Sequence, residues 1–138
     1  MRNVDINNLM ISAERDLELA ENELRKSFED VVSSQVCIHS RRALYKFLQA
    51  LSAMYAEEHN ESIGIHTTIE KLIDFASRYN TTLRHINFSY LHCKCNDLKT
   101  SENKNLHCPS VHKVRYCVGL AKSVQQIIRE KELHHVHV

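Results

Sequence analysis

The stretch RRALYKFLQALSAMYAEE, residues 41–58, decides the fold class of the chain. Its apolar residues recur at spacings of three and four, which is the period of one helix face. They are Leu44, Phe47, Leu48, Leu51, Met54 and Tyr55. We therefore predict one long helix over 34–58. Because its apolar face is broad, we expect this helix to contact more than one neighbour.

The same period predicts four further helices on either side of this stretch. One covers 9–28, is capped by Asn7 or Asn8 and has an acidic outer face. The others cover 66–79, 82–97 and a final segment from Pro109 to about 132, where proline suits the first helical turn. We predict an all-α fold: a single up-and-down bundle of about five helices over 1–138, with its core in 9–132 and a frayed, His-rich tail over 133–138.

Composition excludes several other classes of protein. With 2 Gly and 1 Pro in 138 residues, the turns of a β-sandwich or barrel cannot be built, and neither can a glycine-rich phosphate loop. No apolar run approaches the roughly 20 residues that span a bilayer. The first eight residues lack the apolar segment of a signal peptide, so we expect a cytoplasmic protein. The 5 cysteines, an odd number, argue against a disulfide framework.

The net charge of +1 hides a charge asymmetry between the two halves of the chain. Residues 1–70 carry 7 Lys/Arg against 12 Asp/Glu, whereas residues 71–138 carry 11 against 5. The stretch 78–122 is more basic still, with 8 cations, 2 acids and 4 histidines. A basic half indicates a polyanion or an acidic partner surface. The alternative is that the acidic first helix packs its flank against the basic helices.

A polar stripe along the predicted helix 82–97 is the first candidate site. Its members share one helix edge at spacings of four, three and four: His85, Ser89, His92 and Asn96. Arg84 lies beside this edge, and Arg78 lies one turn before the helix. An imidazole can move a proton and a guanidinium can stabilise phosphorane charge, so Arg78, Arg84, His85 and His92 are candidate catalytic residues for RNA cleavage. The alternative is an ordinary exposed helix edge.

Further residues of the basic half are candidates for binding rather than for catalysis. They are Ser89, Lys94, Asn96, Lys113 and Arg115. Thiols and imidazoles also cluster within 92–117, and one set could hold zinc: Cys93, Cys95, Cys108 and His112. However, a Cys-x-Cys pair on a helix points its thiols about 200° apart, and the chain has no Cys-x-x-Cys pair. We therefore expect no metal and no other cofactor.

The order of these elements resembles that of the HEPN superfamily (higher eukaryotes and prokaryotes nucleotide-binding). A long acidic-faced first helix precedes a second that reads CIHSRRALYKFLQAL over 37–51. A short third helix opens at His66, and the last helix reads VGLAKSVQQII over 118–128. The resemblance covers roughly residues 9–132 and rests on this layout.

The resemblance implies a small helical bundle that is often dimeric. Many such domains are metal-independent ribonucleases carrying Arg, four to six residues and then His. Others lack that motif and serve as RNA- or nucleotide-binding modules, or as toxin–antitoxin-type partners of a small nucleotidyltransferase. Here Arg78 and His85 fit the count, but the turn 80–82 lies between them; Arg84 and His92 are separated by seven residues, one too many.

We therefore expect a HEPN-like, non-catalytic binding module that engages nucleic acid, a nucleotide or an acidic protein through its basic half. The first alternative is a metal-independent endoribonuclease using Arg and His of the fourth helix. The second is a zinc-stabilised interaction module. A homodimer through helices 34–58 and 82–97 would bring two copies of the His85/His92 edge together.

Overall fold

A computed structural model describes residues 5–25, 32–64, 67–89, 107–108 and 111–136, and within these ranges the chain is an all-α bundle. Five helices and one minimal β-pair make up the described residues: α1 (Ile6–Arg25), β1 (Val32–Ser33), α2 (Ser34–Glu58), α3 (Ile69–Ser77), α4 (Thr81–Arg84), β2 (His107–Cys108) and α7 (Val111–Val136). β1 and β2 pair antiparallel, with Val32 opposite Cys108. The predicted fold class is confirmed, and the predicted bounds of the second helix match α2.

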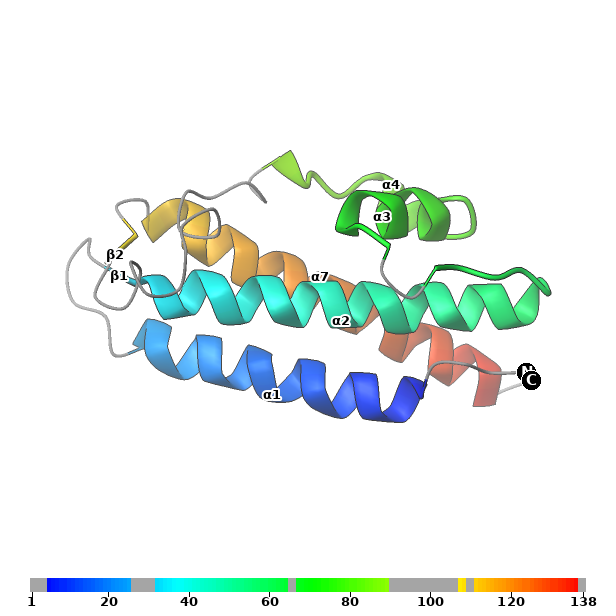
Figure 1. Cartoon of the computed structure of the whole chain (residues 1–138), viewed down its shortest axis with the longest axis horizontal. Coiled ribbons are helices and arrows are strands. Elements are labelled where there is room, and N and C mark those ends of the chain that lie inside the picture. The colour runs from blue at the N-terminus through cyan, green and yellow to red at the C-terminus, as the bar shows by residue number, and fades with distance from the viewer. Residues whose placement is uncertain (1–4, 26–31, 65–66, 90–106, 109–110, 137–138) are drawn as a thin grey trace.

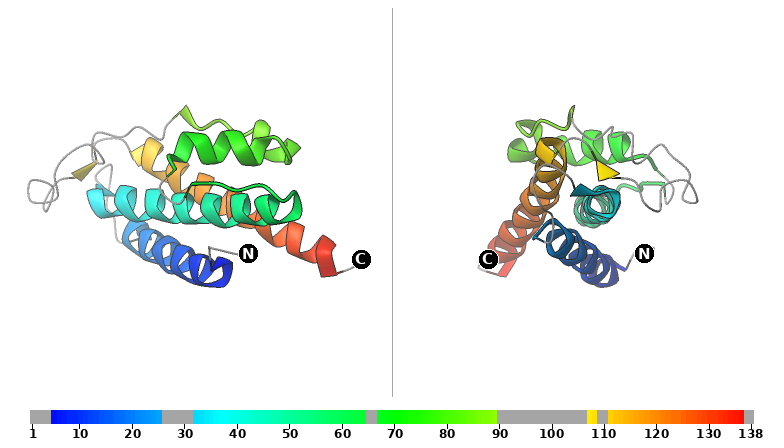
Figure 2. Two further views of the ribbon diagram at one scale, coloured as in Figure 1. Left: turned by 45° about the vertical axis from the view of Figure 1, so that its right-hand side comes forward. Right: turned by 90° about the vertical axis from the view of Figure 1, so that its left-hand side faces the viewer.

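Three long helices form the body of the bundle, and a shorter layer covers one side of it. α1 runs antiparallel to α2, and α7 crosses obliquely behind α2 (Figure 1). α3 and α4 lie on the opposite side of α2 from α1, as the views in Figure 2 also show. We call α1, α2 and α7 the bundle body, and residues 67–89 the α3–α4 layer.

α2 is the centre of the core because α1, α3 and α7 all pack against it. It contacts α1, α7 and α3, so its broad apolar face is covered within one chain. Phe47, Leu44, Leu48 and Leu51 have no exposed surface. The prediction that this helix contacts more than one neighbour is therefore confirmed, with three neighbours in the same chain.

The other elements supply one apolar face each to this core. Its buried members outside α2 are Ala13, Leu17 and Ala20 of α1, Ile69, Leu72, Phe75 and Ala76 of α3, Leu83 of α4, and Val114, Val118, Leu120, Ala121, Val124, Ile127 and Ile128 of α7. In α1 and α7 these positions recur at helical spacing, which is the pattern that the sequence showed. No helix among the described residues is long and apolar enough to cross a membrane.

Local hydrogen bonds determine where several helices begin. α1 begins one residue earlier than its predicted caps: the Asp5 Oδ1 atom accepts from the Asn8 backbone N–H at 3.1 Å, so the predicted capping by Asn7 or Asn8 is wrong. Thr68 caps α3 in the same way, accepting from the backbone N–H of Lys71 at 3.2 Å. α7 continues to Val136, into the segment for which we predicted a frayed tail.

Candidate functional site

The predicted fourth helix is much shorter than expected. Asn80 caps α4 by accepting from the Leu83 N–H at 2.9 Å, but the helix ends at Arg84, with His85 as its C-cap. Asn87 explains the early end: its side chain accepts from the Ser89 N–H at 2.9 Å, and its carbonyl accepts from the Tyr116 hydroxyl at 2.5 Å. Short polar side chains of this kind compete with helical hydrogen bonds.

The polar stripe therefore does not run along one helix through residues 85–89. His85 is exposed in the turn that ends α4, residues 86–88 are not helical, and the exposed Ser89 has 3₁₀ backbone, so the predicted continuous helix over 82–97 is wrong for this part. His92, Lys94 and Asn96 lie outside the described residues, as do the zinc candidates Cys93 and Cys95. The side chains of Cys108, His112 and Lys113 also lie outside them. Among the residues that are described, no group of three or more His, Cys, Asp or Glu could hold a metal.

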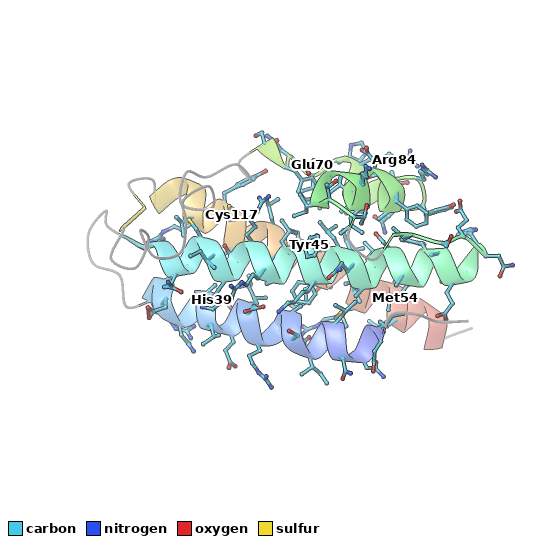
Figure 3. The ribbon with its side chains drawn as sticks, viewed as in Figure 1. His39, Tyr45, Met54, Glu70, Arg84 and Cys117 are labelled. Atoms are coloured by element: carbon cyan, nitrogen blue, oxygen red, sulfur yellow. The ribbon has the colours of Figure 1, made fainter. Side chains whose placement is uncertain are left out.

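Arg84 is engaged by the backbone of α3. Its Nε atom donates to the Ser77 carbonyl at 2.7 Å, and one terminal nitrogen donates to the Arg78 carbonyl at 3.4 Å. These carbonyls belong to the end of α3, where backbone acceptors lack helical partners. Figure 3 shows Arg84 on the layer, away from α1. Arg84 thus fixes the end of α3 against α4. The predicted polar stripe along one helix did not include this role.

A cleft of about 620 Å³ lies on the layer beside α3. Its wall combines three charged residues of α3 and its C-cap, Lys71, Asp74 and Arg78, with the apolar side chains of Ile63 and Phe75. Ser62, Gly64 and Thr67 complete the lining. The Arg78 guanidinium lies 5.5 Å from the centre of the Phe75 ring, which it partly covers. None of the three charged residues forms an ion pair within the described chain.

Aromatic side chains pack next to this cleft, at the end of α2. The Tyr79 ring stacks on His59 at 4.1 Å and on Tyr55 at 5.3 Å, and Phe75 meets it edge-on. The Tyr79 hydroxyl donates to Glu61; this hydrogen bond and partial burial raise the pKa of Tyr79. The cluster fixes the turn after α3 to the end of α2, so it supports one side of the cleft.

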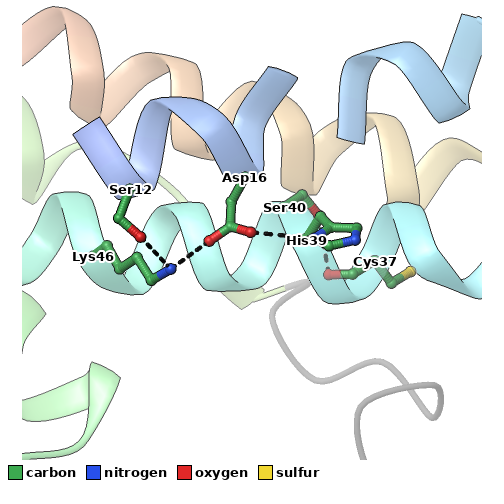
Figure 4. A network of polar contacts seen from close by, with 6 residues as sticks. All are labelled: Ser12, Asp16, Cys37, His39, Ser40 and Lys46. Atoms are coloured by element: carbon green, nitrogen blue, oxygen red, sulfur yellow. Dashed lines mark hydrogen bonds and ion pairs between the residues drawn. The ribbon is translucent and has the colours of Figure 1, made fainter. Parts of the chain in front are cut away.

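A second polar cluster lies between α1 and α2, and sequence reasoning missed it. The Asp16 carboxylate accepts from Lys46 Nζ at 2.6 Å and contacts His39 Nδ1 at 3.2 Å, while Lys46 also donates to Ser12 at 2.7 Å (Figure 4). Asp16 is 7% exposed. Burial alone would raise the pKa of Asp16, but the hydrogen bonds from Lys46 and His39 outweigh it and lower the pKa below its ordinary value.

One signal in the sequence could have found this cluster. Asp16 lies three residues after Ala13 and four before Ala20, and Ala13 lies four after Leu9, so Asp16 is on the apolar stripe of its helix. A carboxylate at such a position needs a partner, because an unpaired buried charge is costly. Lys46 and His39 are the partners, and all three act within the bundle body.

The cations of α7 are largely used inside the chain. Lys122 pairs with Glu21 at 3.0 Å, Arg129 with Glu14 at 3.6 Å, and Lys131 with Glu58 of α2. The first two pairs are those expected if the acidic first helix packs its flank against a basic helix. Arg115 is exposed and has no ion pair among the described residues. The basic half is therefore not one continuous cationic face along α7.

Comparison with protein-family models, with curated proteins and with solved structures found no significant match to this chain. The resemblance to the HEPN superfamily therefore stays a prediction from the layout of the helices.

Proposed function

We propose that the chain is a non-catalytic, HEPN-like binding module for RNA, and that the α3–α4 layer is its binding surface. The observation that carries this proposal is the cleft wall, where Lys71 and Arg78 both lie without a carboxylate partner among the residues that the structure describes. Cations that are not neutralised by the protein are available to phosphates, whose contacts dominate affinity for nucleic acid. Arg84 adds a third exposed cation at the end of the same layer.

The layer suits this role better than α7 does. Lys122, Arg129 and Lys131 each already pair with a glutamate. A phosphate that recruited them would first have to displace that partner. Lys71 and Arg78 need no such displacement, and unlike Arg115, which is also unpaired among the described residues, they lie together on the wall of one cleft.

A binding role also agrees better than cleavage with the local geometry. A ribonuclease of the predicted kind needs an Arg and a His held together. The Arg84 guanidinium donates to two α3 carbonyls, whereas His85 is exposed at the C-cap of a four-residue helix. Nothing among the described residues holds the His85 ring against a guanidinium. As further parts of this proposal, the module acts in the cytoplasm and forms a homodimer. Light scattering would test the homodimer.

Fluorescence anisotropy with a labelled single-stranded RNA tests the proposed function. We expect Lys71→Gln with Arg78→Gln to weaken binding and to flatten its dependence on salt, because each lost phosphate contact lowers the slope of log K against log salt by about 0.7. The matched control is Arg15→Gln with Arg42→Gln, which removes two exposed cations of α1 and α2. RNA binding that is absent in the unmodified chain, or equal in both variants, contradicts the proposal.

A further inference from the structure

The charged residues of the cleft alternate in sign along α3. Lys71, Asp74 and Arg78 follow one another at spacings of three and four, so they share one face of the helix. Two turns separate the outer pair, which is about 10 Å along the axis. The cleft thus offers an anion site at each end and a hydrogen-bond acceptor between them.

Asp74 is the residue that a simple phosphate site does not explain. It is exposed, lines the cleft and forms no ion pair with Lys71 or Arg78. A carboxylate repels phosphate, so it would weaken a surface that only attracted the RNA backbone. It accepts hydrogen bonds, however, and the Watson–Crick edge of a base offers donors. Asp accepts from the N4 amino group of cytosine in nucleic-acid complexes.

The rest of the wall suits a planar group. Phe75 and Ile63 make part of the cleft apolar, and the Arg78 guanidinium lies over the Phe75 ring. Phe75 is only 9% exposed, so the Arg78 guanidinium plane is the surface that it leaves for an unpaired base to stack on. The volume of about 620 Å³ lies within the range of small-ligand sites.

From this arrangement we propose that the cleft holds one unpaired RNA base, and that Asp74 selects bases carrying an exocyclic amino group over uracil. Lys71 and Arg78 bind the phosphates on either side of that base. Uracil presents two carbonyl oxygens beside its single N–H, and these face the carboxylate unfavourably. A base in a duplex has its amino group already paired, so the cleft accepts single strands only. This inference rests on the proposed function above.

Oligocytidine and oligouridine of equal length test the inference, because their bases differ only at two positions. Cytosine has an amino group at C4 and no proton at N3, whereas uracil has a carbonyl at C4 and a proton at N3. We expect the unmodified chain to bind oligocytidine at least about five-fold more tightly, the lower end of the discrimination given by a specific base contact. In Asp74→Ala the ratio of the two affinities falls to about one. The affinity for oligouridine rises because a negative charge is removed, whereas oligocytidine also loses its hydrogen bond to Asp74. The ratio is therefore the readout, and circular dichroism confirms that the variant is folded.

Glu18→Gln is the matched control, because it removes one exposed acid of α1. It leaves the ratio unchanged. Equal binding of the two oligonucleotides by the unmodified chain, or a ratio that survives in Asp74→Ala, overturns the base selection but leaves RNA binding intact. Equal binding of duplex and single strand also overturns it. Failure to bind either oligonucleotide overturns the proposed function as well.

Discussion

The bundle body and the α3–α4 layer place their charged groups in opposite ways. In the body, Asp16, Lys46 and His39 satisfy one another between α1 and α2, and the glutamates of α1 pair with cations of α7. In the layer, Lys71, Asp74 and Arg78 line a cleft without ion pairs. The body uses its charges to join helices, whereas the layer leaves its charges available to a ligand.

The attachment of the two regions differs as well. The body is a continuous apolar core centred on α2. The layer contributes only five buried side chains to this same core, Ile69, Leu72, Phe75, Ala76 and Leu83. Single hydrogen bonds also tie it to the body. Tyr45 donates to the Thr67 carbonyl at 2.8 Å and Ser52 to the Leu72 carbonyl at 3.3 Å. We infer that the layer opens at a lower free energy than the body unfolds.

The largest expected effect comes from the centre of the body. Phe47 is 0% exposed, so Phe47→Ala leaves a cavity in the core around α2 and should lower the free energy of unfolding by about 3–5 kcal/mol. Urea unfolding followed by circular dichroism measures this loss. Phe88→Ala in the half-buried outer part of the layer should cost much less. An equal loss in both variants would contradict the proposed difference between the regions.

The long helices were predictable from sequence because their buried residues, such as Phe47, recur at helical spacing. In α2 the apolar residues from Leu44 to Tyr55 recur at helical spacing over about three turns, so periodicity alone determines the element. The layer has no such redundancy: Asn87 alone ends the fourth helix, because its side chain accepts from the Ser89 N–H and its backbone carbonyl accepts from the Tyr116 hydroxyl. The Tyr116 partner is 29 positions away, and a contact of that range leaves no local pattern.

The candidate site was predictable only in part, because it also depends on contacts that leave no local pattern. Arg78 and Arg84 were singled out as cations, and both lie in the layer. Their partners were not foreseen, because cation–ring contact with Phe75 and capping of the Ser77 carbonyl depend on how α3 ends. Lys71 and Asp74 were missed because charges on a short helix read as an ordinary solvated face.

The next largest effect concerns the polar cluster of the body. Asp16→Asn removes the charge that Lys46 and His39 share, and leaves a half-buried ammonium without its partner. We expect a loss of about 1–3 kcal/mol at neutral pH, measured by urea unfolding. Glu18→Gln on the exposed face of α1 should change stability by less than about 0.5 kcal/mol.

The pH dependence of this loss gives a separate check. The pKa of Asp16 is lowered in the folded chain, so its stabilising contribution is present above the ordinary value of about 3.9 and is lost as the pH falls through the folded value. The difference between the unmodified chain and Asp16→Asn should therefore be full at pH 7 and shrink below about pH 4. A difference that grows on acidification would show that Asp16 is not stabilised as a carboxylate.

A smaller and local effect is expected at the cap of α4. Asn80 accepts from the Leu83 N–H and donates to the Tyr55 hydroxyl at 3.0 Å, so it joins the layer to the end of α2. Asn80→Ala should cost about 1 kcal/mol. Amide hydrogen exchange should speed up in residues 81–86 and stay unchanged in α1. Faster exchange throughout α1 and α2 would mean that the layer and the body open together.

The smallest effects are expected from the ion pairs between α1 and α7. Lys122 and Arg129 are both more than half exposed, and exposed pairs contribute about 0–1 kcal/mol. Lys122→Gln with Arg129→Gln should therefore leave unfolding by urea nearly unchanged. It should also weaken RNA binding less than Lys71→Gln with Arg78→Gln does, although each double variant removes two cations. Because the lost charge is the same, any difference in affinity reports position alone, and a stronger effect of the α7 pair would move the binding surface from the layer to the body.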